Sequence, residues 1–280
     1  MHPVELTAAT AGAPVIPLLD PGPELAAQVG EQVEAFGSAA AAGVIDGDLL
    51  AELRTLVDRA LAEDVAWHRP TDIDDVGRVT FLPTYGAEPL RLLAARALMG
   101  PVDAILGSDC HLYTMTTLVQ APGSAGRPIH VDRYFGAKGF VVGLGAMVLL
   151  DDYTEESGLL RIFPELRPSA PDREEFVAHA RRLEAPAGSA CWFDGSVWHD
   201  VLPNRTDRPR RAILLAMVRP WVRQRFDMVR MLSHLDVEAL DVEVQRKLGL
   251  LGLAPGSYEE FYLPAESRPR ELLRRAVERG

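Results

Sequence analysis

The sequence predicts a mainly β protein with flanking helices, built around a sandwich or barrel of short strands. After residue 110, short apolar segments alternate with turn-rich segments, which is typical of such folds. Before residue 107 and after residue 222, apolar residues instead recur every three or four positions, as on amphipathic helices. The chain has 280 residues, of which 48% are hydrophobic and 25% charged, so it can bury a core without disulfides or a structural metal.

Residues 21–107 are expected to be mainly helical. The strongest pattern runs from Asp46 to Leu61, where an acidic first turn precedes one apolar stripe. Weaker helical patterns occupy Pro23–Phe36 and Glu88–Leu106, and we expect Gly100-Pro101 to divide the second of them.

Two segments in the first third of the chain have no helical period. Residues 1–20 are rich in Ala, Pro and Thr and are expected to form an extended lead-in. Residues 68–85 mix Pro, Asp, Gly and aromatic side chains, so we expect either a plain surface connection or a lid over a site.

Residues 108–222 are expected to hold the strands of the core. The expected strands are His111–Gln120, Phe140–Leu150, Leu159–Phe163, Ser189–Phe193 and Ala212–Val218. Helices are expected at Arg173–Leu183 and, within residues 223–280, at Met228–Leu250 and Arg268–Arg279. Because no repeat, low-complexity tract or linker divides the sequence, we expect residues 1–280 to form a single domain.

Charge and apolar patterning exclude two classes of partner. With 29 Lys and Arg against 40 Asp and Glu, the formal net charge is -11, which opposes binding to nucleic acid. The longest nearly uncharged apolar run, Gly139–Leu150, is too short to span a membrane, and no leader is recognised. Cys110 and Cys191 lie far apart in apolar stretches and are expected to be buried thiols. We therefore expect a cytoplasmic protein, monomer or homodimer, with a small-molecule substrate.

Two candidate metal ligands lie close together after the Pro122-Gly123 turn. His130 and Asp132 are two residues apart, so in an extended chain their side chains point to the same face and could chelate one ion. A His-x-Asp triplet is also common as a surface histidine beside a turn carboxylate. The pair therefore indicates a metal site only if a further ligand accompanies it.

His199 is the candidate third ligand. It lies 69 residues after His130, at the end of a strand and tight turn, where a sheet that doubles back could bring it beside the first pair. Two imidazoles and one carboxylate form the facial triad that leaves three positions of Fe(II) open. A hydrogen-bonded core histidine is the alternative interpretation of His199 taken alone.

Arg210 is a candidate for binding an anion. Arg210 and Arg211 run directly into an apolar strand, so their side chains point to opposite faces and one of them faces the core. A guanidinium in the core needs a buried anion. A dicarboxylic acid that chelates the metal at one end and reaches the arginine at the other meets both needs. A solvated basic edge is the alternative for Arg205, Arg208 and Arg211.

Taken together, these residues resemble the phytanoyl-CoA dioxygenase (PhyH) family of Fe(II)/2-oxoglutarate-dependent oxygenases. The resemblance is carried by His130-x-Asp132, His199, Asn204 and Arg210 at their offsets. It covers most of the chain and also includes Pro122-Gly123, Leu149–Asp152, Glu156–Leu159 and Trp221–Gln224.

The resemblance implies a double-stranded β-helix (jelly roll, cupin-like) core and a dioxygenase that uses iron, 2-oxoglutarate and O2. Iron would be held by His130, Asp132 and His199, and the C5 carboxylate of 2-oxoglutarate would pair with Arg210, eleven residues beyond the distal histidine. Hydroxylation of an unactivated C–H bond, with release of succinate and CO2, is the implied reaction. Asp132 argues against halogenation, because related halogenases carry a small residue there.

The chain departs from the family pattern at two places. Val201 stands where the family often has a serine that helps to hold the C5 carboxylate, and Pro164–Arg167 replaces the usual Pro-Gly-Ser-His. A hydroxyl of Thr114, Thr116 or Thr117, with Thr117 as the candidate, is expected to bond the C1 carboxylate, although threonine is also an ordinary strand residue. The aromatic side chains that flank the ligands could contact substrate or merely pack: Tyr134, Phe135 and Trp198.

Two other classes of function fit the same residues. One is a non-catalytic jelly-roll protein that binds a small molecule and forms no succinate. The other is a cupin metalloenzyme that needs no 2-oxoglutarate. In that case, Arg210 could be replaced without raising the Michaelis constant of any co-substrate. The substrate itself is not specified beyond a small molecule such as an amino acid derivative or a secondary metabolite.

Overall fold

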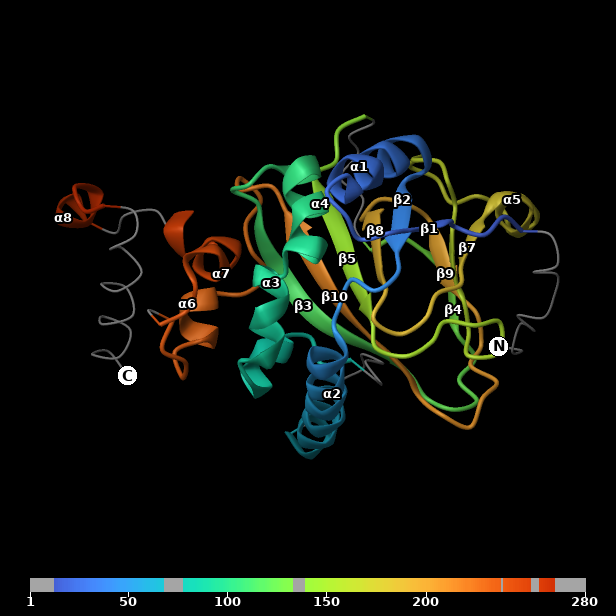
Figure 1. Ribbon diagram of the computed structural model, residues 1–280, viewed down its shortest axis with the longest axis horizontal. Coiled ribbons are helices and arrows are strands. Elements are labelled where there is room, and N and C mark those ends of the chain that lie inside the picture. Colours follow the sequence, from blue (N-terminus) through green and yellow to red (C-terminus); the bar gives the residue numbers. More distant parts are fainter. Residues whose placement is uncertain (1–12, 68–77, 133–138, 238, 253–256, 265–280) are drawn as a thin grey trace.

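The computed structural model describes residues 13–67, 78–132, 139–237, 239–252 and 257–264. Two β-sheets enclose a core, and helices cover the outer face of the larger sheet (Figure 1). The expected mainly β fold with flanking helices, a double-stranded β-helix, is therefore confirmed.

The larger sheet has six strands and is buried on both faces. In spatial order they are β1 (Leu18–Leu19), β2 (Ser38–Ala41), β8 (Ala190–Asp194), β5 (Gly143–Leu149), β10 (Arg210–Val218) and β3 (His111–Gln120). All neighbours are antiparallel except β1 and β2. Strand β10 pairs along most of its length with both β5 and β3, so its register is held from two sides.

The smaller sheet has four short antiparallel strands. Their order is β4 (Arg127–His130), β9 (His199–Val201), β6 (Leu160–Ile162) and β7 (Arg181–Leu183). The pairing of β4 with β9 contains an irregularity between Arg127 and His130. This sheet carries the candidate histidines.

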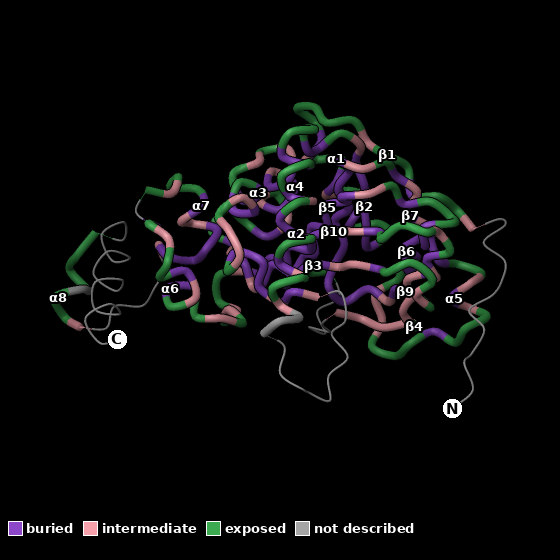
Figure 2. The backbone as a smooth tube through the Cα atoms, turned by 90° about the horizontal axis from the view of Figure 1, so that it is seen from below, coloured by how far each residue is buried: buried purple, intermediate pink, exposed green. Residues whose placement is uncertain are grey.

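The two faces of the larger sheet pack against different partners. Along β10, Ile213 and Leu215 belong to the cluster that packs under the helices, whereas Ala212 and Leu214 belong to the cluster between the sheets. The alternation follows from the period of two residues in a strand. Figure 2 shows the buried strands at the centre of the molecule and the exposed helical surfaces around them.

The helices before β3 begin and end largely as their patterns indicate. They are α1 (Leu25–Phe36), α2 (Gly47–Trp67), α3 (Arg91–Ala94) and α4 (Arg96–Leu106), with short 3-10 turns at Leu82–Tyr85 and Glu88–Leu90. Asp46 caps α2, since its carboxylate accepts a hydrogen bond from the Leu49 N–H at 2.8 Å. Trp192 in the larger sheet donates its indole N–H to the Leu98 carbonyl of α4 at 3.0 Å, which ties the helices to the sheet.

Two expected boundaries before residue 184 are wrong. Gly100-Pro101 does not divide its helix, because Pro101 lies inside α4 and the break falls at Ala95, whose backbone is extended. The expected helix Arg173–Leu183 ends early: α5 covers Arg173–His179, and Arg181–Leu183 forms β7 because it pairs with β6.

The part that follows β10 is less helical than expected. Its elements are α6 (Met228–Met231), α7 (Val242–Lys247), a 3-10 turn at Leu250–Gly252 and α8 (Tyr258–Phe261), so the expected helix Met228–Leu250 is interrupted. The expected helix Arg268–Arg279, residues 1–12 of the lead-in and residues 68–77 of the possible lid lie outside the described residues.

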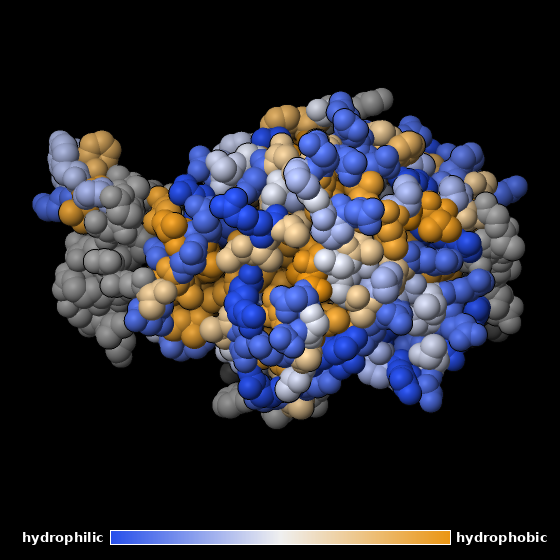
Figure 3. All heavy atoms as spheres, in the orientation of Figure 1, coloured by the Kyte–Doolittle hydropathy of each residue, from blue (hydrophilic) through white to orange (hydrophobic). Residues whose placement is uncertain are grey.

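Both cysteines are buried and unpaired, as expected. None of the helices in the described part of the chain has the length and apolar character that crossing a membrane requires. Figure 3 shows a mostly hydrophilic face on which apolar side chains gather between α2 and the helices that follow β10.

Candidate metal centre and its pocket

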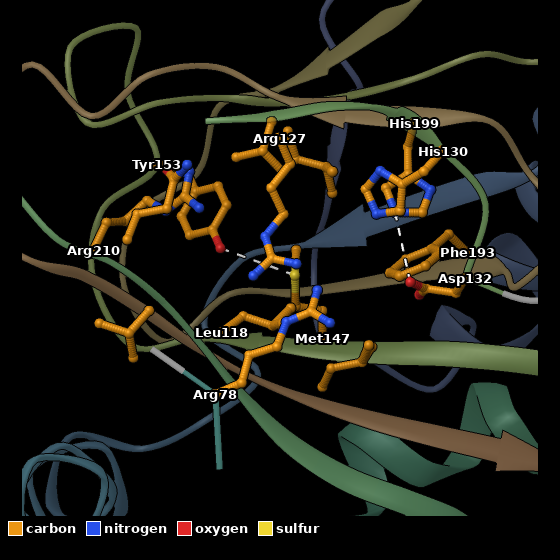
Figure 4. A pocket seen from close by; sticks show the side chains of 15 residues that line it. Arg78, Leu118, Arg127, His130, Asp132, Met147, Tyr153, Phe193, His199 and Arg210 are labelled. Atoms are coloured by element: carbon orange, nitrogen blue, oxygen red, sulfur yellow. Dashed lines mark hydrogen bonds and ion pairs between the residues drawn. The ribbon is translucent and has the colours of Figure 1, made fainter. Parts of the chain in front are cut away.

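The three candidate ligands meet where β4 and β9 pair. His130 ends β4 and lies opposite His199, the first residue of β9. One ligand atom from each of His130, Asp132 and His199 lies within 4.8 Å of the other two. Oδ1 of Asp132 is 3.9 Å from Nε2 of His199, and the two imidazole centroids are 4.2 Å apart (Figure 4). The three side chains can therefore hold one metal ion.

Backbone carbonyls orient both imidazoles. Nδ1 of His130 lies 2.8 Å from the Pro128 carbonyl oxygen, and Nδ1 of His199 lies 3.0 Å from that of Val197. An Nδ1–H that donates to a carbonyl leaves Nε2 with the lone pair that binds a metal. Both rings are thus held with the same nitrogen available for coordination.

The environment of His130 favours the neutral imidazole. Burial, and then the proximity of His199, lower the pKa of His130 from 6.5 to about 4. Because metals coordinate the neutral ring, the site does not have to lose a proton from His130 at neutral pH to accept an ion.

Phe193 packs beside the ligands. Its ring centroid lies 5.6 Å from that of His199. The ring fits because its cross-strand neighbour is Gly145, where a Cβ would lie 2.6 Å from Cζ of Phe193. An alanine at Gly145 would therefore clash with the aromatic ring.

Arg210 lies at the other end of the same pocket and lacks an anionic partner among the described residues. The side chain is only 3% exposed, and its guanidinium carbon lies 4.1 Å from the centroid of the Tyr153 ring. One guanidinium nitrogen donates to the Gly158 carbonyl, whereas Nε is buried with no hydrogen-bond partner. Burial lowers the pKa of Arg210, which measures the cost of a cation in this position. A carboxylate placed here would offset that cost.

Apolar side chains separate the two ends of the pocket. Leu118 and Met147 lie between Arg210 and the ligand cluster (Figure 4). The donor set, and a guanidinium without an anionic partner among the described residues, fit the chemistry of a metal and a dicarboxylic acid. Four of the five predicted site residues thus line one cavity: His130, Asp132, His199 and Arg210.

The structure does not bring Thr117, the fifth residue, into this cavity. Its hydroxyl accepts a hydrogen bond from the Val79 N–H at 2.7 Å, and its neighbour on β10, Ile213, faces the helices. Thr114 and Thr116 both donate their hydroxyls to the Thr80 carbonyl, at 2.6 and 3.1 Å. All three hydroxyls bond residues 79–80, and the expectation that one of them binds the C1 carboxylate stays a prediction.

Other residues singled out in the sequence have structural contacts. Trp198 donates its indole N–H to the Arg167 carbonyl at 2.9 Å and does not line the pocket. Asn204 holds the turn before β10, since its amide donates to the carbonyl oxygens of Gln120 and Arg208. Tyr134 and Phe135 lie outside the described residues.

Two further arginines that the sequence did not place in the site also line the pocket, Arg78 and Arg127. Arg127 lies three residues before His130, so in a regular strand the two side chains would point to opposite faces. The irregularity of the β4–β9 pairing between these residues brings both into the cavity. Arg78 lies in a segment without helical or strand periodicity, so the sequence did not predict where its side chain points.

A buried ion pair supports the strand that carries His199. Nε and Nη2 of Arg161 donate to the two carboxylate oxygens of Asp200 at 2.9 and 2.6 Å, and the residues are only 5% and 1% exposed. Arg161 and Asp200 are cross-strand neighbours on β6 and β9, and Ile162 is the neighbour of His199. The two-bond contact therefore joins β6 to β9 at the residue next to the ligand.

Comparisons with known proteins agree with this architecture. Residues 24–212 match the family model described as phytanoyl-CoA dioxygenase (PhyH). An uncharacterised protein of Mycobacterium tuberculosis is 22% identical over 253 residues, covering 86% of this chain and 93% of the relative. The L-proline trans-4-hydroxylase of Streptomyces griseoviridis is 26% identical over 162 residues, covering 45% of this chain and 60% of the hydroxylase.

Solved structures share the fold at low sequence identity. The epimerase SnoN, in complex with Fe3+, α-ketoglutarate and nogalamycin RO, is 20% identical with a TM-score of 0.59, over 79% of this chain and 93% of SnoN. HygX from Streptomyces hygroscopicus, with nickel and 2-oxoglutarate bound, is 15% identical with a TM-score of 0.56, over 69% and 88% of the two chains.

The ion pair beside His199 leads to a test of stability. Replacing Asp200 by Ala leaves the Arg161 cation buried and unpaired, so we expect the free energy of unfolding to fall by about 3–5 kcal/mol in urea titrations. Removing both charges, in Arg161→Met with Asp200→Leu, should cost clearly less. Equal losses in the single and double variants would contradict the importance of the unpaired charge.

Proposed function

The chain belongs to the phytanoyl-CoA dioxygenase (PhyH) family, and we propose that it is an Fe(II)- and 2-oxoglutarate-dependent dioxygenase. In this proposal it hydroxylates an unactivated C–H bond of a small molecule, such as a secondary metabolite or an amino acid derivative, and releases succinate and CO2. One observation carries the proposal. The His130, Asp132 and His199 donors converge at one end of a pocket whose other end holds the buried guanidinium of Arg210, which has no anionic partner among the described residues.

The ligand set fits Fe(II) chemistry. Two imidazole nitrogens and one carboxylate on one side of the ion leave three neighbouring positions open, which is what a chelating co-substrate and O2 require. When bound, iron and 2-oxoglutarate supply the oxidising chemistry, while the protein supplies geometry and excludes water. His130, Asp132 and His199 hold the ion, and Phe193 limits the space beside it.

Arg210 orients the co-substrate in this proposal. Its guanidinium would bind the C5 carboxylate, the end of 2-oxoglutarate farthest from the metal. The stacked ring of Tyr153 and the Gly158 carbonyl hold the guanidinium in place before the acid arrives. The apolar side chains of Leu118 and Met147 then accompany the carbon chain between the two ends.

The outcome of the reaction is a finer part of the proposal. The name of one relative is that of a proline hydroxylase, and one structural neighbour is an epimerase. A product heavier than the substrate by one oxygen atom supports hydroxylation, whereas a product of unchanged mass indicates epimerisation. Both outcomes would use the same metal centre. They differ in whether the substrate gains an oxygen atom.

Removing a metal ligand should abolish turnover. We expect Asp132→Asn or His199→Ala to lower Fe(II)-dependent succinate release by at least about a hundredfold, because each removes one of three bonds to the ion. Isothermal titration with Ni(II) should show the matching loss of metal affinity. His179→Ala is the control, since His179 is exposed on α5 and its Nδ1 bonds only the Glu175 carbonyl among the described residues. Unchanged succinate release in the ligand variants would contradict the proposed centre.

Replacing Arg210 should weaken 2-oxoglutarate binding specifically. Loss of a charge-assisted contact predicts a rise of about 10- to 100-fold in the Michaelis constant for 2-oxoglutarate in Arg210→Gln. Arg211→Gln is a matched control on the opposite face, where Arg211 pairs with Asp151 and Asp58. An unchanged constant in Arg210→Gln would favour a metalloenzyme without this co-substrate.

A further inference from the structure

A short segment is docked against the free edge of β3 by three threonines. The Val79 N–H donates to Oγ1 of Thr117 at 2.7 Å, and the Thr117 N–H donates to the Val79 carbonyl at 3.1 Å. The Thr80 carbonyl accepts hydrogen bonds from both Thr114 and Thr116. Val79 therefore covers the Thr117 N–H, a backbone group that an edge strand would otherwise expose.

This docking places Arg78 in the pocket. Arg78 directly precedes the docked pair, and its guanidinium extends into the cavity between the metal ligands and Arg210 (Figure 4). Its Nε is buried and has no hydrogen-bond partner among the described residues. A guanidinium stays charged and offers several donors, so this orientation favours an anion in the cavity.

The charges of the pocket are unequal. Among the described residues, three guanidiniums line it, from Arg78, Arg127 and Arg210, against one carboxylate, that of Asp132, which belongs to the metal site. In the proposed function, 2-oxoglutarate brings two carboxylates. One would pair with Arg210, and the other would chelate the metal and is assigned to Arg127, because Arg127 is on the strand of His130. Arg78 is then the guanidinium without an anion.

We propose that the substrate of this enzyme is an organic acid whose anionic group, a carboxylate or a phosphate, is bound by Arg78. The inference rests on the proposed function, because it depends on assigning both carboxylates of 2-oxoglutarate elsewhere. The remainder of the substrate is apolar, since the cavity has apolar lining beyond the two side chains assigned to the co-substrate: Leu160, Val201 and Leu214. The guanidinium thus fixes one end of the substrate, and the apolar walls accept the part that bears the reacting C–H bond.

Matched pairs of acids and neutral analogues test this substrate class. The full chain, loaded with Ni(II) and 2-oxoglutarate, is titrated with hexanoate against hexanamide, with 3-phenylpropionate against its amide, and with phenyl phosphate against phenol. We expect at least one acid to bind about tenfold or more tightly than its neutral partner. The carboxylate and phosphate arms distinguish the two possible headgroups. If no acid binds better than its neutral partner, the proposal is overturned.

Variants of Arg78 separate the substrate from the co-substrate. In Arg78→Gln the preference for the acid should disappear, while the dissociation constant of 2-oxoglutarate, measured without other ligands, should change less than about twofold. Arg78→Lys should keep part of the preference, which shows that the charge and not the fold is responsible. Arg223→Gln, at an exposed arginine outside the pocket, should behave as the wild type. A rise in the 2-oxoglutarate constant of Arg78→Gln, equal to the rise for the acid, would show that Arg78 binds the co-substrate instead.

Succinate release in the absence of a prime substrate keeps this inference distinct from the proposed function. If the wild-type protein binds acids through Arg78 but releases no succinate with Fe(II), ascorbate and 2-oxoglutarate, the oxygenase proposal fails and the acid site stands. If succinate forms equally in the wild type and Arg78→Gln, yet acids and amides bind alike, the oxygenase proposal stands and the acid site fails.

Discussion

The site depends on the pairing of two very short strands, β4 and β9. Only this pairing brings His130 beside His199, two residues that are far apart in the sequence. A shift of one residue would turn the side chain of His199 to the opposite face, because side chains alternate along a strand. Two strands of four and three residues make few hydrogen bonds of their own. The pairing of β9 with β6 and the buried contact between Arg161 and Asp200 therefore carry much of the register.

The larger sheet sets the other end of the pocket by a different means. Arg210 and Arg211 begin β10, and the long pairing of β10 with β5 and β3 leaves no freedom in which face each one takes. Arg211 faces outward and finds the carboxylates of Asp151 and Asp58, whereas Arg210 faces inward and finds an aromatic ring and a carbonyl. Of these two adjacent arginines, Arg211 is thus paired with carboxylates, whereas Arg210 has no anionic partner among the described residues. The inward one is stable only where a cation can be compensated by hydrogen bonds or by an anion that enters the pocket.

The sequence predicted those features that depend on local spacing. The His-x-Asp spacing, the inward arginine and the limits of β3 all follow from residues close together in the chain, since alternation and apolar runs are local signals. The position of Thr117 outside the cavity lining was not predicted, because alternation alone does not tell which face of an edge strand meets the pocket, and its hydroxyl bonds Val79 from a distant segment. Arg127 was missed because an irregularity in the strand pairing reverses its expected direction. The strand β7 was read as helix because its pairing with β6 overrides the local pattern.

The predicted site residues and Arg78 differ in the part of the fold that carries them. The groups that would bind iron and the far carboxylate of 2-oxoglutarate lie at the ends of β4, β9 and β10, where strand geometry determines their direction. Arg78 enters the cavity from a segment that is attached to the sheet by threonine hydroxyls and backbone bonds. Because such a segment can change without disturbing the strands that hold the metal, it is the part of the fold best suited to select a substrate. The threonines of β3 then contribute to specificity indirectly, by holding the backbone from which Arg78 reaches the pocket.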